Sequence, residues 1–393
     1  MTNGTESAAG SLPPDAPVVV IGAGVIGASV AFHLAEAGVR EVLVLDRDRP
    51  AGGSSGKPIG GVRAQFSDPL NIRLGQRSLA AFRDFPQRPG VDVGLDEVGY
   101  LFLLGDGDEV AAFEDSVATQ NALGVPSRIV TPREAHGLCP YLDPKGLVAA
   151  AYSPADGYAL PRAAVAGYLD AAVRLGATVR ANCAVTAIDS ANGAIRAVRT
   201  TGGTVRTPAV VCAAGAWSAQ VGNMAGVRLP VTPLRRQIAF TGPLRQAPPR
   251  IPFTLDLGST LYFHNDGAGG LLLGMSDPRQ PPGFDRSFTL DWLPLFRAAA
   301  ALRAPELAGL DVTDGWAGLY EMTPDRNALI GEAAAPGRFL YATGFSGHGF
   351  LQAPAVGEII RDLFLRRTPV IDVAPLAAGR FTSRANRPEK AVI

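Results

Sequence analysis

Residues 18–46 read VVVIGAGVIGASVAFHLAEAGVREVLVLD, and this stretch decides the fold. The apolar run 18–22 is typical of a buried strand, residues 25–38 have a helical pattern, and 41–46 are again typical of a strand. Strand, helix and strand in this order predict a βαβ unit whose first turn carries glycines. The start of the chain is therefore expected to fold as a dinucleotide-binding unit.

The glycines follow the G-x-G-x-x-G pattern of phosphate-binding turns. Gly22 is expected to make the turn, Gly24 to let the backbone approach a diphosphate, and Gly27 to let the helix pack on the strand. The helix N-terminus adds unpaired N–H groups and a positive dipole for the phosphates. Asp46 ends the second strand, where a carboxylate accepts hydrogen bonds from ribose hydroxyls. Packing alone also produces such turns, but the four features in order favour a dinucleotide.

Three further glycine-rich segments are expected near this ligand, each with a simpler alternative. The loop 52–66, GGSSGKPIGGVRAQF, offers backbone amides and cations, or it is an ordinary solvated loop. The turn AAGAWS at 213–218 follows an apolar strand, where small residues permit close approach to a cofactor or only tight packing. GFSGHGF at 344–350 leads from a strand into a helix whose N-terminus stabilises negative charge. Its His348 is either functional or a capping histidine.

Composition limits the class of partner. The 393 residues include 36 basic and 36 acidic side chains, and 47% are hydrophobic. This length predicts two domains, and a balanced charge favours a small molecule over nucleic acid. The apolar run 18–32 resembles a signal peptide, but no Lys or Arg precedes it, and we interpret it as a buried strand and helix. No membrane span is expected. Cys139, Cys183 and Cys212 lack metal or disulfide spacing, which predicts no metal site and a reducing, cytoplasmic location.

The pattern along the chain predicts an α/β fold with two interleaved domains. A Rossmann-like nucleotide-binding domain is expected from residues 17–84, 148–225 and 321–385. An α+β substrate domain with an antiparallel sheet is expected from residues 85–147 and 226–320. Residues 1–16 and 386–393 are expected to be tails.

Four segments together resemble the FAD-dependent D-amino acid oxidase and sarcosine oxidase superfamily. They are residues 18–38, GGVRAQFS at 60–67, GLYEMTPDRNALIG at 318–331 and GFSGHGFLQAPAVGE at 344–358. Within the superfamily the chain is most similar to the sarcosine oxidase β-subunit, the proline dehydrogenase β-subunit and the dimethylglycine dehydrogenase-like group. A GG-hydrophobic-R-x-Q-F sequence before a helix is typical of that group.

The resemblance implies bound FAD and oxidation of a C–N bond in an amine or amino acid, with secondary or N-methylated amino acids favoured. Hydride passes from the carbon next to the substrate nitrogen to flavin N5, and water hydrolyses the imine. Oxygen or another acceptor then takes the electrons, and the chain is compatible with a homo- or hetero-oligomer. The implied FAD contacts are Gly22, Gly24, Val25, Ile26, Gly27, Asp46, Arg47, Ser54, Ser55, Gly61, Val62, Arg63, Val185, Ala214, Gly215, Trp217, Gly347, His348, Gly349, Phe350 and Leu351.

The resemblance also implies catalytic candidates. Arg63 is the first choice to clamp a substrate carboxylate, because a guanidinium binds carboxylate through two hydrogen bonds. Tyr262 and Tyr320 shape the pocket or donate hydrogen bonds, or they are half-buried sheet tyrosines. His348 is a further candidate, and His264 and Gln352 are weaker ones.

Departures from the family pattern affect the expected chemistry. Single-chain sarcosine oxidases have lysines where Leu351 and Leu272 stand, one for the substrate carboxylate and one close to where oxygen reacts. Their absence favours dehydrogenase behaviour or electron transfer to a partner. Gly318 replaces the cysteine that tethers the flavin in some members, and the early loop lacks a tethering histidine, so dissociable FAD is expected.

Two other functions remain open. An NAD(P)H-dependent flavin monooxygenase also begins with G-x-G-x-x-G, but GFSGHG and IGEAAAPG argue against it. An FAD-binding accessory subunit of a heteromeric amine dehydrogenase would account for the missing lysines. The sequence fixes neither the substrate nor the electron acceptor.

Overall fold

The predicted βαβ unit lies in a six-stranded sheet in the computed structural model, which describes residues 11–382, 388–389 and 391. From one edge to the other, the strands are β18 (Leu329–Glu332), β19 (Phe339–Thr343), β12 (Val210–Cys212), β1 (Val19–Ile21), β2 (Leu43–Leu45) and β8 (Thr178–Arg180). Only the edge strand β18 is antiparallel to its neighbour in this sheet. The first, middle and last parts of the chain therefore meet in one sheet.

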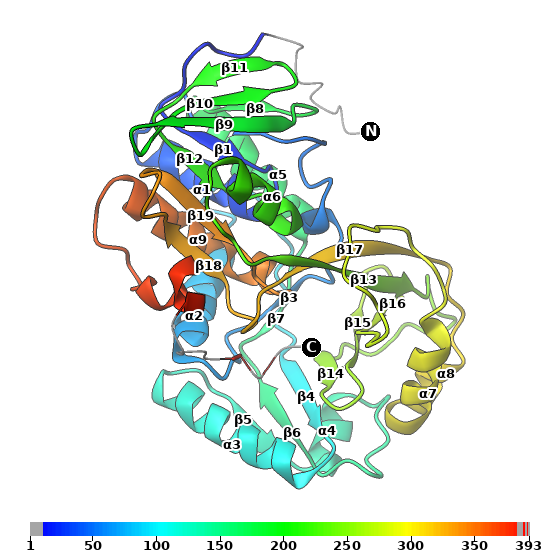
Figure 1. Ribbon diagram of the computed structural model, residues 1–393. Helices are drawn as coiled ribbons and strands as arrows, with labels where there is room; N and C mark the ends of the chain where they lie inside the picture. The colour runs from blue at the N-terminus through cyan, green and yellow to red at the C-terminus, as the bar shows by residue number, and fades with distance from the viewer. Residues whose placement is uncertain (1–10, 383–387, 390, 392–393) are drawn as a thin grey trace.

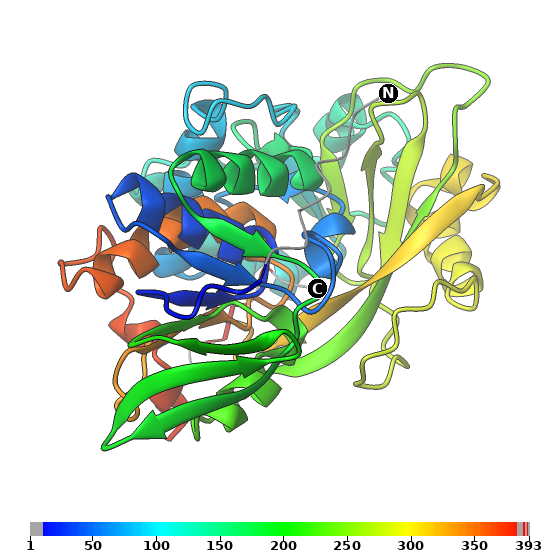
Figure 2. The same cartoon turned by 90° about the horizontal axis from the view of Figure 1, so that it is seen from above.

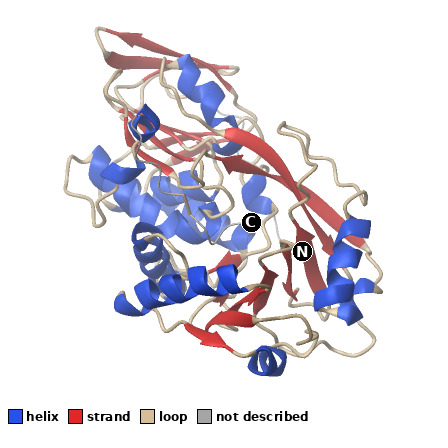
Figure 3. Ribbon diagram, turned by 60° about the horizontal axis from the view of Figure 1, so that its bottom comes forward, coloured by secondary structure: helices blue, strands red, loops and turns tan. Residues whose placement is uncertain are grey.

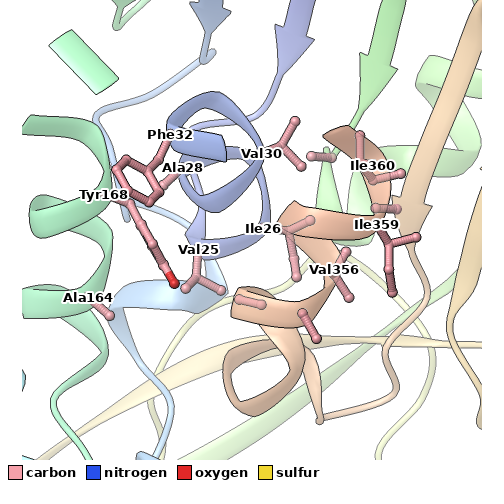
Figure 4. Close-up of a cluster of buried hydrophobic side chains, with 14 of the residues drawn as sticks. Val25, Ile26, Ala28, Val30, Phe32, Ala164, Tyr168, Val356, Ile359 and Ile360 are labelled. Carbon is pink, nitrogen blue, oxygen red and sulfur yellow. The ribbon is translucent and has the colours of Figure 1, made fainter. Parts of the chain in front are cut away.

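Helices cover one face of this parallel sheet. Helix α1 (Val25–Glu36) is buried from Val25 to Ala35, because it lies between α5 (Pro161–Arg174) and α9 (Gly349–Phe364). Figure 4 shows Tyr168 of α5 on one side of α1 and Ile359 of α9 on the other. The helices α2 (Pro69–Arg83) and α6 (Ser218–Met224) complete this domain. Helix α2 begins at an Asp68 cap, whose side chain accepts a hydrogen bond from the Leu70 N–H.

The opposite face of the parallel sheet carries a small antiparallel sheet. Its strands are β9 (Val185–Ala191), β10 (Ala194–Thr200) and β11 (Gly203–Arg206). Since side chains alternate along a strand, Val18 and Val20 pack with the helices, whereas Val19 and Ile21 pack with β9–β11. Burial on both faces explains why the sequence 18–21 is uniformly apolar.

The second domain is built on an eight-stranded sheet. Its strands, in spatial order, are β17 (Asp314–Met322), β13 (Thr232–Phe240), β16 (Leu271–Met275), β15 (Leu261–Asn265), β14 (Phe253–Asp256), β4 (Tyr100–Leu104), β6 (Ala149–Ser153) and β5 (Arg128–Val130). The surrounding helices are α3 (Gly107–Ala122), α4 (Pro132–Leu138), α7 (Leu293–Arg303) and α8 (Pro305–Ala308). A short ribbon of β3 (Gly61–Val62) and β7 (Gly157–Tyr158) completes the strands.

The two long strands β13 and β17 connect the halves of the molecule. Figure 1 shows these two strands of the larger sheet running from the first domain into the second, and Figure 2 shows the same crossing from above. In Figure 3 the long strands end near the helices α7 and α8, on the side of the molecule away from the parallel sheet. The face of β13 and β17 is therefore placed next to the ends of the parallel strands.

The structure differs from the sequence-based expectations in three details. The larger sheet is mixed, because β4 from the earlier segment pairs parallel with β14 from the later one. Strand β6 belongs to this sheet although it lies within residues 148–225, which were assigned to the nucleotide-binding domain. Glu389 and Ala391, expected in a tail, are buried. The predicted domain boundaries otherwise stay predictions, and residues 1–10, 383–387, 390 and 392–393 lie outside the described part of the chain.

Candidate functional site

A cavity of about 440 Å³ lies between the carboxyl ends of the parallel strands and the larger sheet. This volume is within the range of small-molecule sites, and the ends of parallel strands are their usual location in α/β folds. All the predicted catalytic residues line the cavity. So do all the predicted cofactor contacts except Gly27 and Val62. The structure thus brings together residues predicted from widely separated motifs.

The first glycine turn forms one end of the cavity. Gly22 has a φ of 112°, which glycine adopts readily, and a Cβ there would lie 2.3 Å from the Ala213 carbonyl oxygen. A Cβ at Gly27 would lie 1.8 Å from the Gly22 oxygen, so this glycine permits the packing of α1 on the turn. Gly27 therefore lies outside the cavity and packs against the turn at Gly22, in the position that the glycine pattern predicts.

Gly24 lines the cavity, and it differs from Gly22 and Gly27 because a Cβ there would meet no backbone atom within 4 Å. A Cβ at residue 24 would meet only Ser55, whose Oγ would be 2.9 Å away. The Ser55 Oγ also accepts a hydrogen bond from the Val25 N–H at 2.9 Å. Ser55 belongs to a single 3-10 turn (Ser54–Gly56), so the early loop lies directly against the N-terminus of α1. This is the position expected for a diphosphate group.

Asp46 lies beside the same turn at the end of β2. Its carboxylate accepts hydrogen bonds from the Ala23 N–H at 2.7 Å and from the Asp48 N–H at 2.8 Å. Burial raises the pKa of Asp46, and these two N–H groups act against that rise. The remaining lone pairs of the carboxylate are available for ribose hydroxyls.

Aromatic and cationic side chains form the outer wall of the cavity beside the first glycine turn. Trp217 stacks on Phe284 with ring centroids 5.5 Å apart. The guanidinium of Arg47 lies 4.9 Å from the Trp217 ring centroid, and that of Arg286 lies 5.5 Å from it. Arg286 comes from the substrate-domain sequence and lies 4.0 Å from Asp48. Flat rings and cations at this end suit an adenosine diphosphate.

The second glycine turn, residues 344–348, leads from β19 into α9. Gly347 has a φ of 102°, and a Cβ there would lie 2.7 Å from the ring of Tyr320. Glu321 ties β17 to this turn, since its Oε2 accepts hydrogen bonds from the Thr343 hydroxyl at 2.8 Å and the Gly344 N–H at 3.0 Å. Burial raises the pKa of Glu321. The N-terminus of α9 consequently faces the cavity beside Tyr320.

Arg63 is buried, with 4% of its surface exposed, and its guanidinium already has partners. It donates to the carbonyl oxygens of Gln65 and Ala391, the latter at 2.6 Å, and it lies 3.3 Å from the Nε2 of His348. Its Cζ is also 4.0 Å from the ring centroid of Phe66. Burial, and then the charge of Arg63, hold the pKa of His348 well below its usual value. The imidazole is thus neutral, and its Nε2 accepts from Arg63.

Tyrosines and apolar side chains form the inner end of the cavity. Tyr262 on β15 pairs with Gly274 of β16, where a Cβ would lie 2.1 Å from the tyrosine ring. Tyr100 stacks on Phe253 with centroids 4.3 Å apart and an interplanar angle of 8°. Burial raises the pKa of Tyr100, Tyr262 and Tyr320. All three phenols therefore keep their protons at neutral pH and are available as hydrogen-bond donors.

These residues fit FAD. Gly24, whose added Cβ would meet only Ser55, lines the same cavity as the cationic outer wall around Trp217 and the apolar end beside the tyrosines. The first end suits a diphosphate and adenosine, and the second suits a flat, weakly polar ring. When bound, FAD would supply the acceptor for a hydride. Gly22, Gly24, Ser55 and Asp46 would hold its adenosine diphosphate.

Some predicted residues lie elsewhere. Val62 is buried in the core of the first domain. The weaker candidates His264 and Gln352 do not line the cavity; the former bonds to the Ile59 carbonyl at 2.8 Å and the latter to Asn71 at 3.2 Å. Leu351 lines the cavity, whereas Leu272 does not.

Cavity residues that were not identified from the sequence include Tyr100, Arg236, Glu321 and Ala391. Adjacent arginines at 235 and 236 within a β-strand pattern were a signal for Arg236, because alternation directs one of the two towards each face. The other three depend on strand pairing or on chain folding that has no periodic pattern.

Potential metal ligands do not cluster in the part of the chain that the structure describes. No group of three or more His, Cys, Asp or Glu residues there is arranged to hold a metal ion. The three cysteines are buried and free. Within the described ranges, no helix combines the length and apolar character needed to cross a membrane.

Comparisons with known proteins identify the family. The model of the FAD dependent oxidoreductase family matches residues 17–363. Mitochondrial dimethylglycine dehydrogenase of Mus musculus is 27% identical over 405 residues, which cover 97% of this chain and 46% of that protein, so the chain spans about half its length. The crystal structure of L-proline dehydrogenase from P. horikoshii has a TM-score of 0.89 and 32% identity, covering 94% of this chain and 99% of that one.

The structure of glycine oxidase from Geobacillus kaustophilus has a TM-score of 0.84 and 27% identity, covering 94% of this chain and 99% of that one. The predicted resemblance and the predicted fold class are confirmed by these matches. The chain therefore belongs to the FAD dependent oxidoreductase family.

Proposed function

We propose that this chain oxidises the C–N bond of an amino acid or amine, with secondary or N-methylated amino acids as the favoured substrates. The observation that carries the proposal is one cavity that joins two glycine turns to a pocket lined by Tyr100, Tyr262 and Tyr320. The names of the relatives support this substrate class, since they include a dimethylglycine dehydrogenase and an L-proline dehydrogenase. The product imine is hydrolysed by water.

The residues of the chain contribute binding, orientation and the exclusion of water. The buried inner pocket lowers the local dielectric constant, which favours a substrate nitrogen in its neutral form. Tyr262 and Tyr320 hold protonated hydroxyl groups and would orient the substrate by hydrogen bonds. Arg63, predicted to hold a carboxylate, supports the pocket wall through Gln65, His348 and Ala391.

We further propose that FAD binds without a covalent bond. Gly318 lies opposite Arg236 in the β13–β17 pair and offers no side chain for attachment. Electron transfer to a partner protein or another acceptor is favoured over rapid reaction with oxygen, because Leu351 and Leu272 replace the family lysines. The cytoplasm stays the expected compartment, in agreement with three buried free thiols. An oligomer, of this chain alone or with another, is compatible with this reaction.

An anaerobic substrate panel tests the proposal. FAD-loaded protein is mixed with proline, sarcosine, dimethylglycine, glycine and D-amino acids, and the visible flavin band is followed. We expect at least one of the secondary or N-methylated amino acids to bleach the band without any partner protein. Bleaching by NADPH alone would support the monooxygenase alternative. Bleaching by none of these compounds without a partner protein would support the accessory-subunit alternative.

A further inference from the structure

The cavity contains a second guanidinium, Arg236, and we propose that it binds the carboxylate of the substrate. This inference rests on the proposed function and defines its substrate class as amines that carry a carboxylate group. Arg63 would then be a positioning residue of the pocket wall. The proposal follows from the position of Arg236 and from a comparison of the partners of the two guanidinium groups.

Strand register places Arg236 on the cavity face of the larger sheet. Arg236 of β13 pairs with Gly318 of β17, and paired residues in an antiparallel sheet share a face. Its guanidinium lies 5.2 Å from the ring centroid of Tyr320. The preceding residue, Arg235, points to the other face, where its Nη1 lies 2.9 Å from Asp285. The strand therefore directs one arginine into the cavity and one away from it.

Most hydrogen-bond donors of Arg236 lack a partner within the described chain. A guanidinium has five N–H donors, and among the described residues Arg236 makes one hydrogen bond, from its Nη1 to the Arg235 carbonyl at 3.3 Å. Its Nε is buried and has no partner among the described residues. Among those residues, no carboxylate lies within ion-pair distance of Arg236. The hydrogen bond from Arg279 and, to a smaller extent, the charge of Arg236 lower the pKa of Asp277, but Asp277 forms its ion pair with Arg279 at 2.8 Å.

Arg63 has the opposite arrangement. Its two terminal nitrogens are bonded to the Gln65 and Ala391 carbonyl oxygens and to His348. A carboxylate that bound these nitrogens through two hydrogen bonds would have to displace one of these partners, and a buried group left without its hydrogen bond is unfavourable. Arg236 requires no such exchange. A buried N–H without an acceptor is itself unfavourable, so a carboxylate would stabilise this side of the cavity.

The surroundings of Arg236 also fit a carboxylate. Tyr320 packs against the guanidinium of Arg236 and restricts its movement. The arginine side chain therefore loses little conformational entropy when its planar N–H groups bind a carboxylate. Ile238, Phe253 and Leu255 line the same cavity and keep water away, which strengthens a charged pair. Tyr262 lies close enough for the charge of Arg236 to act on its hydroxyl. A carboxylate held bidentately by Arg236 would leave the amine end free to reach the other cavity residues.

A pair of probes isolates the charged group. Pyrrole-2-carboxylate and neutral pyrrole share one ring and differ in the carboxylate, and binding of either to FAD-loaded protein is followed by the change in the visible flavin spectrum. The variant Arg236→Gln is compared with Arg235→Gln, which removes the same charge from the adjacent position on the opposite face. Arg236→Lys serves as the conservative variant, and Arg63→Lys tests the competing assignment.

We expect the wild-type protein to bind the acid more tightly than pyrrole, and Arg236→Gln to weaken the acid by at least about 30-fold with pyrrole unchanged. Arg235→Gln should match wild type, and Arg236→Lys should recover part of the affinity, because a lysine keeps the charge and loses the fork. The proposal is overturned if the wild type does not prefer the acid, or if Arg63→Lys alone loses that preference. It is also overturned if Arg236→Gln loses FAD instead of the acid.

The same experiment distinguishes this inference from the proposed function. If the acid binds as expected but no amino acid bleaches the flavin, the proposed function fails and the assignment of Arg236 stands. If amino acids bleach the flavin and Arg236→Gln leaves their KM unchanged, the assignment fails and the proposed function stands.

Discussion

Replacing Gly24 with alanine should abolish tight FAD binding while leaving the protein folded. The φ of −76° and ψ of −177° at this residue are accessible to alanine, so the backbone is not strained. The new Cβ would meet only Ser55, 2.9 Å from its Oγ, and this hydroxyl must shift. Losing its bond to Val25 costs about 1 kcal/mol, which the lower entropy of the unfolded chain partly offsets.

The cofactor should be affected far more. Gly24 faces the cavity at the N-terminus of α1, so the added methyl group occupies the space through which a diphosphate approaches the backbone. We expect the Kd for FAD to rise at least about 100-fold, which corresponds to about 2.7 kcal/mol. In contrast, Gly27→Ala would place its Cβ 1.8 Å from a backbone oxygen and should destabilise the fold by about 1–3 kcal/mol or more.

The assay combines FAD titration of the apoprotein by fluorescence with thermal unfolding of the same samples. Gly137→Ala is the matched control, because a Cβ there meets no atom within 4 Å. The double variant Gly24→Ala/Ser55→Ala removes the contact with the hydroxyl and should still bind FAD weakly. The reasoning is refuted if Gly24→Ala keeps its FAD affinity within threefold of wild type, or if Ser55→Ala restores it.

Three other predictions concern the non-covalent binding of FAD, the C-terminal residue Glu389 and the buried side chain of Asp156. Acid precipitation should leave the flavin in the supernatant, since Gly318 offers no attachment point, and a yellow pellet would contradict this. Glu389→Gln should lower the free energy of unfolding by about 1–3 kcal/mol in urea titrations, because the buried carboxylate accepts from the Ser67 and Asp68 N–H groups and from Asn71; an unchanged midpoint would remove this anchoring role. Burial raises the pKa of Asp156 from 3.8 to about 6, so the folded state retains a proton that the unfolded state loses, and stability falls as the pH rises through this window. Asp156→Asn should therefore gain up to about 3 kcal/mol relative to wild type between pH 4 and 7, and parallel pH profiles of the two proteins would count against it.

Local patterns account for the parts of the structure that could be predicted. The βαβ unit of residues 18–46 has apolar strands and a helix joined by a glycine turn, and these signals act within a few residues. The turn at 344–350 also follows a strand and contains glycines, and it leads into α9 as expected. The approach of both turns to one cavity followed from the family resemblance, and the parallel sheet provides its physical basis.

Long-range pairing accounts for what could not be predicted. The parallel contact between β4 and β14 joins strands that begin at Tyr100 and Phe253, 153 residues apart in the sequence, and no local signal specifies it. Register also decides that Arg236 rather than Arg235 faces the cavity, because a shift of one residue exchanges their faces. Glu389 and Ala391 lie in a short segment without periodicity, so their burial against α2 and Arg63 had no signature in the sequence.

The absorption spectrum of the purified protein, incubated with FAD and freed of unbound cofactor by gel filtration, tests the central claim most directly. That claim is that the two glycine turns and the early loop form one site for FAD. We predict a flavin spectrum that corresponds to one FAD for each chain and that disappears in Gly24→Ala. Protein that stays colourless and takes up no FAD would contradict the account.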